Sequence, residues 1–262
     1  MLNLSPAEWS TWMNRWDRQQ TAYLPDRETA LGLILDVVAV LVGEPTQLVD
    51  LASGPGSIAL RAGARFPQAR VTAVDADPFL LALGQAGAGR IAFQRADLLE
   101  PGWDVVLGSD RVDAVCSATS LHYFSAAEFA GLAEVLARRI RPDGVFVNLD
   151  TLRLGAEVPR LSELAASLRD HGWDGSPPST PSAQGGSAAS SADEDWASWW
   201  AAARAEPAFA QLLAERDRLA IAPTEASPVT LPEMIESLRA AGFAEVGVLR
   251  QTADKHLVVA IR

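Results

Sequence analysis

The sequence predicts an α/β fold in which a mainly parallel sheet is covered by helices on both faces. Between residues 46 and 150, short apolar segments alternate with amphipathic ones, as in successive β–α–β units. A glycine-rich turn follows the first apolar segment, and acidic residues close the first three. Two more apolar segments near the C-terminus are joined by Gln-Thr-Ala-Asp-Lys, a connection so short that they must be antiparallel neighbours.

Each expected element is bounded by a change of periodicity or by a turn residue. Pro25 separates the first two helices, and Gly43-Glu44-Pro45 ends the second. Helices are expected at 5–20, at 27–42, from the glycine turn through Arg65, and at 78–87, 126–139, 195–219 and 231–241. Strands are expected at 47–52, 70–75, 90–94, 112–117, 144–150, 244–250 and 256–262.

Composition limits the classes of function. The 262 residues carry 22 Lys+Arg against 33 Asp+Glu, a net charge of −11, and Lys255 is the only lysine. Such a chain is not expected to bind nucleic acid, which needs concentrated basic residues. One cysteine and three histidines argue against a disulfide framework and a metal centre. The N-terminus resembles no signal peptide and the longest apolar stretch, 31–42, is too short to span a membrane, so a soluble, cytoplasmic protein is expected.

The chain divides into a core and two cap segments. The core is expected at 46–150 and 231–262, with an N-terminal helical cap at 1–45 and a cap or lid insertion at 151–230. Within that insertion, 174–195 is rich in Pro, Gly and Ser and is predicted to be a flexible loop, either a lid or a tolerated surface insertion.

Tryptophans form one-sided helical stripes in both cap segments, at residues 9, 12 and 16 and at residues 196, 199 and 200. They either anchor the cap helices to the core, which we favour, or line a pocket for an aromatic or cationic acceptor.

The residues with the clearest chemical meaning lie at consecutive strand ends. Glycines at 54 and 56 let the backbone approach a ligand closely, and the helix that follows offers free N–H groups. Asp75 ends the second strand, where a carboxylate can accept hydrogen bonds from ribose hydroxyls. A nicotinamide dinucleotide also fits such a turn. Asp50, however, would repel a pyrophosphate, and the acid after the third strand, Asp97, is surplus to a dinucleotide site.

The motifs together resemble the class I S-adenosylmethionine-dependent methyltransferases. These motifs are Asp-x-Ala-x-Gly-x-Gly at 50–56, Asp75, Ala96-Asp97, Arg-Pro-Asp-Gly at 141–144 and the closing Ala-Gly-Phe at 241–243. The resemblance covers about 46–150 and 231–262. It implies a Rossmann-like, doubly wound sheet of seven strands in the order 3-2-1-4-5-7-6, with the last strand antiparallel, and S-adenosylmethionine as cofactor.

The resemblance also implies the binding residues. Asp50 and the backbone of the glycine turn hold the methionine part, Asp75 the ribose, and Asp97 the adenine edge. The full set is Tyr23, Arg27, Asp50, Ala52, Ser53, Gly54, Gly56, Asp75, Ala76, Asp97, Leu98, Ser117 and His122. Ala52 departs from the glycine that is usual in the family. Asp50 capping a turn and Asp75 capping a helix remain alternatives, although Asp77 is the better helix cap.

Catalysis is harder to assign, because a sulfonium methyl group needs in-line placement more than it needs catalytic groups. His122, after the fourth strand, is the first candidate base, and packing against the cofactor is its alternative. Tyr123 either orients a substrate or packs, and Asp150 is a lesser base candidate or a helix cap. His171 is expected to be exposed, and His256 is expected to lie away from the cleft without a role.

The function indicated is methyl transfer to oxygen, nitrogen or carbon of a small, specialised metabolite, without a metal. The alternatives are an NAD(P)-dependent oxidoreductase and an S-adenosylmethionine-binding regulator or cyclase that transfers no methyl group. The oligomeric state stays open, with a homodimer as one option.

Overall fold

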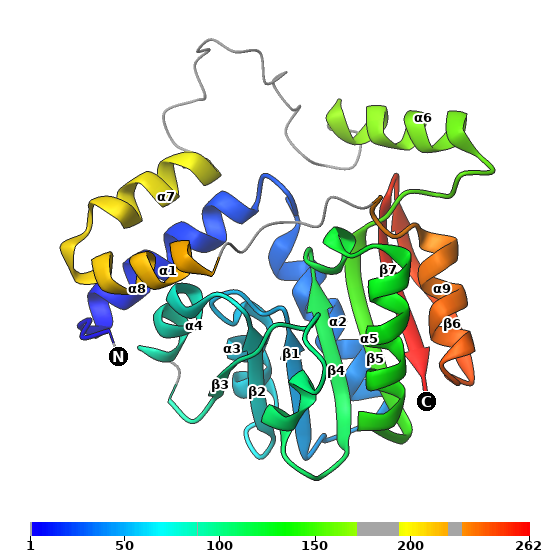
Figure 1. Cartoon of the computed structure of the whole chain (residues 1–262), viewed down its shortest axis with the longest axis horizontal. Coiled ribbons are helices and arrows are strands. Elements are labelled where there is room, and N and C mark those ends of the chain that lie inside the picture. Colours follow the sequence, from blue (N-terminus) through cyan, green and yellow to red (C-terminus); the bar gives the residue numbers. More distant parts are fainter. Residues whose placement is uncertain (1, 88, 172–193, 220–226) are drawn as a thin grey trace.

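The fold is built on one seven-stranded sheet in the order β3-β2-β1-β4-β5-β7-β6, as predicted (Figure 1). The computed structural model describes residues 2–87, 89–171, 194–219 and 227–262. The strands are β1 Gln47–Leu51, β2 Arg70–Asp75, β3 Ala92–Arg95, β4 Val112–Ala118, β5 Ile140–Thr151, β6 Glu245–Thr252 and β7 Lys255–Ile261. Pairing is parallel from β3 to β5, whereas β7 is antiparallel to both of its neighbours.

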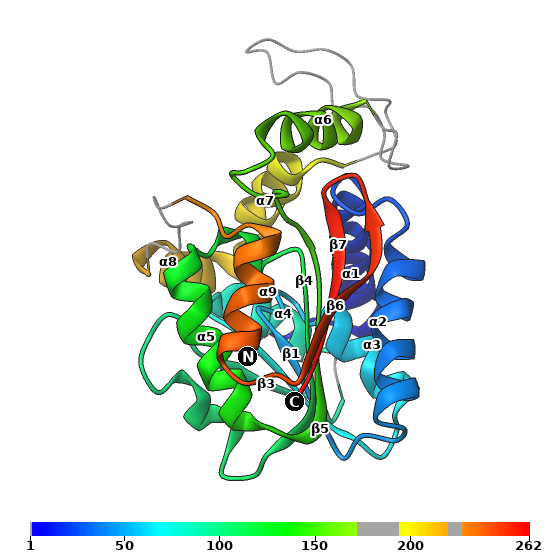
Figure 2. The same cartoon turned by 90° about the vertical axis from the view of Figure 1, so that its right-hand side faces the viewer.

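Helices cover both faces of the sheet (Figure 2). On one face lie α5 Ala126–Arg139 and α9 Leu231–Ala240, and on the other lie α2 Arg27–Leu41 and α3 Ser57–Arg65. Strand residues alternate between the two layers: Val49 and Leu51 pack towards α5, and Leu48 packs towards α2 and α3. Both faces are therefore apolar, which explains why the sequence shows continuous apolar strands.

A third layer of helices packs beside α4 Pro78–Gln85. It consists of α1 Pro6–Gln20, α7 Trp196–Ala205 and α8 Ala210–Arg218, which form one buried cluster with α4 (Figure 1). The helix α6 Pro159–Asp170 buries one side chain, Ala165. Of the segment expected to be a flexible loop, residues 174–193 lie outside the described residues.

Several boundaries differ from expectation. β5 starts at Ile140 rather than 144, because Ile140 already pairs with Val112 of β4 before a register shift, and Asp143 takes a left-handed φ of 60° within the bulge. Residues 195–219 form α7 and α8 instead of one helix, because a proline at position 207 starts a short 3-10 turn between them. The final hairpin turns tightly at Ala253, with φ 54°. The helix α6 was not predicted at all.

No helix within the described ranges is both long and apolar enough to cross a membrane.

Candidate functional site

The glycine turn between β1 and α3 has a backbone that few residues can adopt. Gly54 and Gly56 have φ values of 54° and 83°. A Cβ atom at Gly56 would lie 2.8 Å from the Phe93 ring, so glycine is required there for space as well as for backbone geometry. Ala52 has a φ of 52°, where a side chain costs about 1–2 kcal/mol. The departure at Ala52 therefore carries strain at the centre of the turn.

Asp75 at the end of β2 is bound to this turn. One carboxylate oxygen accepts the Gly54 N–H at 2.7 Å, and the other accepts the Asp77 N–H at 2.8 Å. Each oxygen keeps one acceptor direction for a further donor. Burial raises the pKa of Asp75 to about 6. Asp77, not Asp75, caps α4, since it accepts the N–H groups of Phe79 and Leu80.

The third acid follows β3 on the same sheet edge. The Ala96 N–H donates to the Asp75 carbonyl at 3.0 Å, which brings the Asp97 segment beside the end of β2. Asp97 is exposed, and its carboxylate accepts the Leu99 N–H. Leu98 and Ala76 are half-buried.

Asp50 lies beneath α3. Its Oδ2 accepts the Ala59 N–H at 2.8 Å, which satisfies one of the free donors of the first helical turn. The side chain is 1% exposed, and burial raises its pKa to about 8. This is the turn-capping geometry that the sequence left open, and the predicted contact of Asp50 with a methionine moiety stays a prediction.

Arg27 and Tyr23 connect the N-terminal segment to the core in different ways. The buried Arg27 guanidinium donates to Asp17 at 3.0 Å and to the Ser57 hydroxyl at 2.7 Å, so it joins α1, α2 and the start of α3. Tyr23 is half exposed. It lies near Tyr123, whose pKa is raised by burial and then by the charges of Tyr23 and Asp150. Tyr23 is thus close enough to the loop after β4 for its charge to affect Tyr123.

His122 forms a dyad with Asp150, the last but one residue of β5. The His122 Nδ1 lies 2.5 Å from Asp150 Oδ1, which also accepts the Thr151 N–H. Asp150 Oδ2 accepts the backbone N–H groups of Leu121 and His122. Because each carboxylate oxygen already accepts two hydrogen bonds, Asp150 fixes the position of the imidazole rather than offering a free base.

The surroundings of His122 raise the pKa of its imidazole. Burial lowers the pKa of His122, but the Asp150 charge and hydrogen bond outweigh it, so the pKa lies above its usual value. The imidazole side chain is 27% exposed, and its ring stacks on Tyr123 with centroids 4.1 Å apart. His122 is therefore oriented, accessible and in contact with a phenol.

Two serine hydroxyls hold the β4 end against the glycine turn. Ser117 donates to the Leu51 carbonyl at 2.9 Å, and Ser120 donates to the Ala52 carbonyl at 3.1 Å. The loop that carries His122 is thereby placed beside Ala52. Ser120 was not predicted as a site residue, because no sequence pattern indicates a hydrogen bond from its hydroxyl to the distant Ala52 carbonyl.

The tryptophan stripes pack mainly on each other. Trp199 lies 5.0 Å from Trp16 and 5.8 Å from Trp12 between ring centroids, and Phe79 of α4 contacts Trp200. The guanidinium groups of residues 15 and 216 lie 4.2 Å above Trp12 and Trp200. This packing agrees with the anchoring interpretation, because these rings are occupied by the protein's own side chains.

The two remaining histidines differ in solvent exposure. His171 is exposed, as expected. His256 is fully buried and stands directly opposite Asp150 in the β5–β7 register, so the expectation that it lies away from the cleft is wrong. The antiparallel return of β7 brings it there. Burial lowers its pKa.

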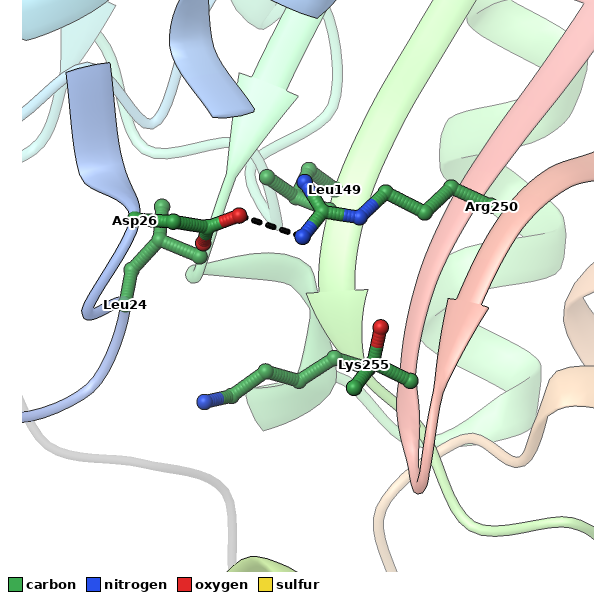
Figure 3. Close-up of a pocket in the computed structure, with 6 residues that line it drawn as sticks. Leu24, Asp26, Leu149, Arg250 and Lys255 are labelled. Atoms are coloured by element: carbon green, nitrogen blue, oxygen red, sulfur yellow. Dashed lines mark hydrogen bonds and ion pairs between the residues drawn. The ribbon is translucent and has the colours of Figure 1, made fainter. Parts of the chain in front are cut away.

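The link between α1 and α2 reaches the other end of the same sheet edge (Figure 3). Leu24 and Asp26 face Leu149, Arg250 and Lys255 around a small pocket, and Asp26 forms an ion pair with Arg250. The N-terminal segment is thus held at both ends: by Trp16 at the glycine turn and by Asp26 at the last strands. In the parts of the chain described, no group of three or more His, Cys, Asp or Glu could hold a metal ion.

Comparison with known proteins agrees with this geometry. Residues 48–144 match the family model of a methyltransferase domain. Residues 48–144 therefore belong to a methyltransferase domain, and its sheet has the strand order that the sequence motifs implied.

Curated relatives match parts of this chain. Release factor glutamine methyltransferase of Vibrio cholerae is 35% identical over 79 residues, which are 30% of this chain and 27% of that protein. Trans-aconitate 2-methyltransferase of Methylobacterium nodulans is 28% identical over 170 residues, 59% of this chain and 61% of that protein. The chain thus spans about a quarter to three fifths of the length of these relatives.

Two solved structures share the fold at low identity. An O-methyltransferase family protein from Burkholderia thailandensis has a TM-score of 0.52 at 19% identity, covering 92% of this chain and 57% of that chain. Magnesium protoporphyrin IX methyltransferase from Synechocystis, with bound SAH, has a TM-score of 0.53 at 15% identity. That match covers 97% of this chain and 95% of the other.

Proposed function

We propose that the protein transfers a methyl group from S-adenosylmethionine to a small-molecule acceptor, with His122 as the general base. The dyad carries this proposal. A histidine fixed through Nδ1 by a fully hydrogen-bonded carboxylate keeps Nε2 available to accept a proton. Asp150 positions His122 and raises its pKa. An acceptor that loses a proton, at a hydroxyl or an amine, makes best use of this pair.

The residues at the strand ends suit the cofactor. Bound S-adenosylmethionine supplies a methyl group already activated on a sulfonium. Asp75 has one acceptor direction free on each oxygen, which matches the two hydroxyls of a ribose. Asp97 and Leu98 adjoin that site, and the backbone of the glycine turn faces the same edge. Ser117, whose hydroxyl is engaged by Leu51, would contribute through its backbone.

The acceptor is proposed to enter beside the two tyrosines. Tyr123 stacks on His122, and Tyr23 lies near Tyr123, so that aromatic rings would exclude water from a reacting hydroxyl or amine. A net charge of −11 supports a small molecule over a nucleic acid. In this scheme residues 1–45 and 151–230 cap the core at 46–150 and 231–262.

The test combines binding with turnover. S-adenosylhomocysteine should raise the melting temperature, whereas NAD(H) and NADP(H) should not, and the reverse result indicates an oxidoreductase. A panel of phenols, hydroxy acids and amines, with a tRNA transcript and a release-factor peptide included, is then screened for S-adenosylhomocysteine release. Turnover only on the tRNA or the peptide contradicts the small-molecule proposal. Binding without any release indicates a regulator or a cyclase.

A further inference from the structure

One polar side chain in the N-terminal segment is buried without a bond. Gln19 of α1 is 1% exposed, and neither its amide nitrogen nor its amide oxygen has a hydrogen-bond partner among the described residues. Buried amides in native proteins are normally paired, since an unpaired one costs free energy that water would otherwise supply. Gln19 therefore requires a hydrogen-bond partner that the described residues do not provide.

The place of Gln19 on α1 indicates where that partner lies. Trp16 precedes Gln19 by one helical turn on the same face of α1, whereas Tyr23 lies in the turn that follows the end of the helix at Gln20. The Trp16 ring approaches to 3.4 Å of the position that a Cβ on Gly54 would occupy. Tyr23, at the other end, lies near Tyr123. Gln19 thus lies one helical turn from Trp16, the residue that packs α1 against the glycine turn.

The charged side chains of Asp50 and Arg27 already form hydrogen bonds within the protein. The Asp50 carboxylate is bonded to Ala59 beneath α3, and the Arg27 guanidinium is bonded to Asp17 and Ser57. The amino-acid end of the cofactor carries an ammonium and a carboxylate, and so needs both an acceptor and a donor. A side-chain amide provides both on one group.

We propose that Gln19 recognises the amino-acid end of S-adenosylmethionine, its amide oxygen accepting from the ammonium group and its amide nitrogen donating to the carboxylate. This rests on the proposed function, and it extends the cofactor site to α1. Gln19 is a cofactor-binding residue in this scheme, and α1 is part of the site rather than a scaffold only.

A structural alternative comes from Trp199, which contacts Trp16 and whose indole N–H also has no partner among the described residues. If Gln19 instead bonds to Trp199, its loss destabilises the protein without changing which ligands bind. The two roles are distinguished by comparing two ligands that differ only at the amino-acid end.

The experiment titrates S-adenosylhomocysteine and 5′-methylthioadenosine, which lacks the aminocarboxypropyl group, into wild type and Gln19→Leu by calorimetry. We expect Gln19→Leu to weaken S-adenosylhomocysteine binding about tenfold or more, because two charge-assisted bonds are lost. Binding of 5′-methylthioadenosine should stay unchanged. Gln20→Leu, a neighbouring buried amide on α1, is the matched control and should bind both ligands like wild type.

The outcomes separate the role of Gln19 from the proposed function. Unchanged binding of S-adenosylhomocysteine, or an equal loss for both ligands, overturns the role of Gln19. Failure of wild type to bind either ligand refutes the proposed function instead. If Gln19→Leu does not fold, Gln19→Met, which keeps the length of the side chain, is subjected to the same comparison and the same criteria.

Discussion

Replacing Asp150 by asparagine tests the dyad directly. The carboxylate accepts the His122 Nδ1–H and the Thr151 N–H on one oxygen, and the Leu121 and His122 N–H groups on the other. The side-chain oxygen of an asparagine can still accept the Leu121 and His122 backbone N–H groups. The asparagine NH₂ group then faces the Thr151 N–H and the imidazole. His122 must present an unprotonated Nδ1 to that amide, so its proton moves to Nε2, where it blocks base catalysis.

The magnitude follows from the bonds lost. The charge-assisted bond to His122 and the bond to Thr151 together contribute about 2–4 kcal/mol to the free energy of unfolding. Turnover should fall by about 10²–10⁴-fold, the usual contribution of a positioned general base. Any residual activity should have its acidic limb, where activity rises with pH, at lower pH than wild type, because the charge that raises the His122 pKa has been removed.

The assay measures S-adenosylhomocysteine release in single-turnover experiments between pH 5.5 and 9, with calorimetric S-adenosylhomocysteine affinity as a second readout, expected to be unchanged. Asp113→Asn is the matched control. Asp113 accepts bonds from Thr46, Gln47 and Arg141 at the opposite edge of the sheet, so its loss should cost stability but not turnover. Wild-type turnover in Asp150→Asn, or turnover lost only in parallel with cofactor affinity, would refute the reasoning.

Three further outcomes are expected. Asp75→Ala should weaken S-adenosylhomocysteine binding by about 1.5–3 kcal/mol for each ribose bond, or about tenfold or more, and unchanged calorimetric affinity would contradict the cleft assignment. Trp199→Ala should lower the free energy of unfolding in urea by about 3–5 kcal/mol, whereas a raised KM at unchanged stability would favour an acceptor pocket. Asp50→Asn should stabilise the ligand-free protein. The folded Asp50 holds its proton to about pH 8, whereas the unfolded side chain ionises near 3.8. Wild-type stability therefore falls across that interval, and the variant should be more stable at pH 8 by on the order of 2–4 kcal/mol but equal at pH 4. Parallel pH–stability curves for wild type and Asp50→Asn would contradict this.

The strand ends could be predicted because their signals are local. β2 and α5 have the predicted bounds, because the spacing of their apolar residues and the residues that end each element can be read within or next to the segment itself. Asp75 was predicted to hold ribose hydroxyls, and its role stays a prediction, but its bond to Gly54 follows from the parallel pairing of β1 with β2. Strand order followed from the motif set rather than from any single segment.

The sequence alone determined the class of the domain, because spacing and periodicity encode the α/β alternation, the glycine turn and the acids that follow the strands. It did not determine which side chains meet across the fold. Asp150 is separated from His122 by 28 residues, and their bond exists because β4 and β5 end together. His256 stands opposite Asp150 because β7 returns antiparallel. Gln19 is an ordinary polar residue in a helix until the packing of α1, with Trp16 against Gly54, buries it. Long-range packing decides such contacts, and no local pattern records it.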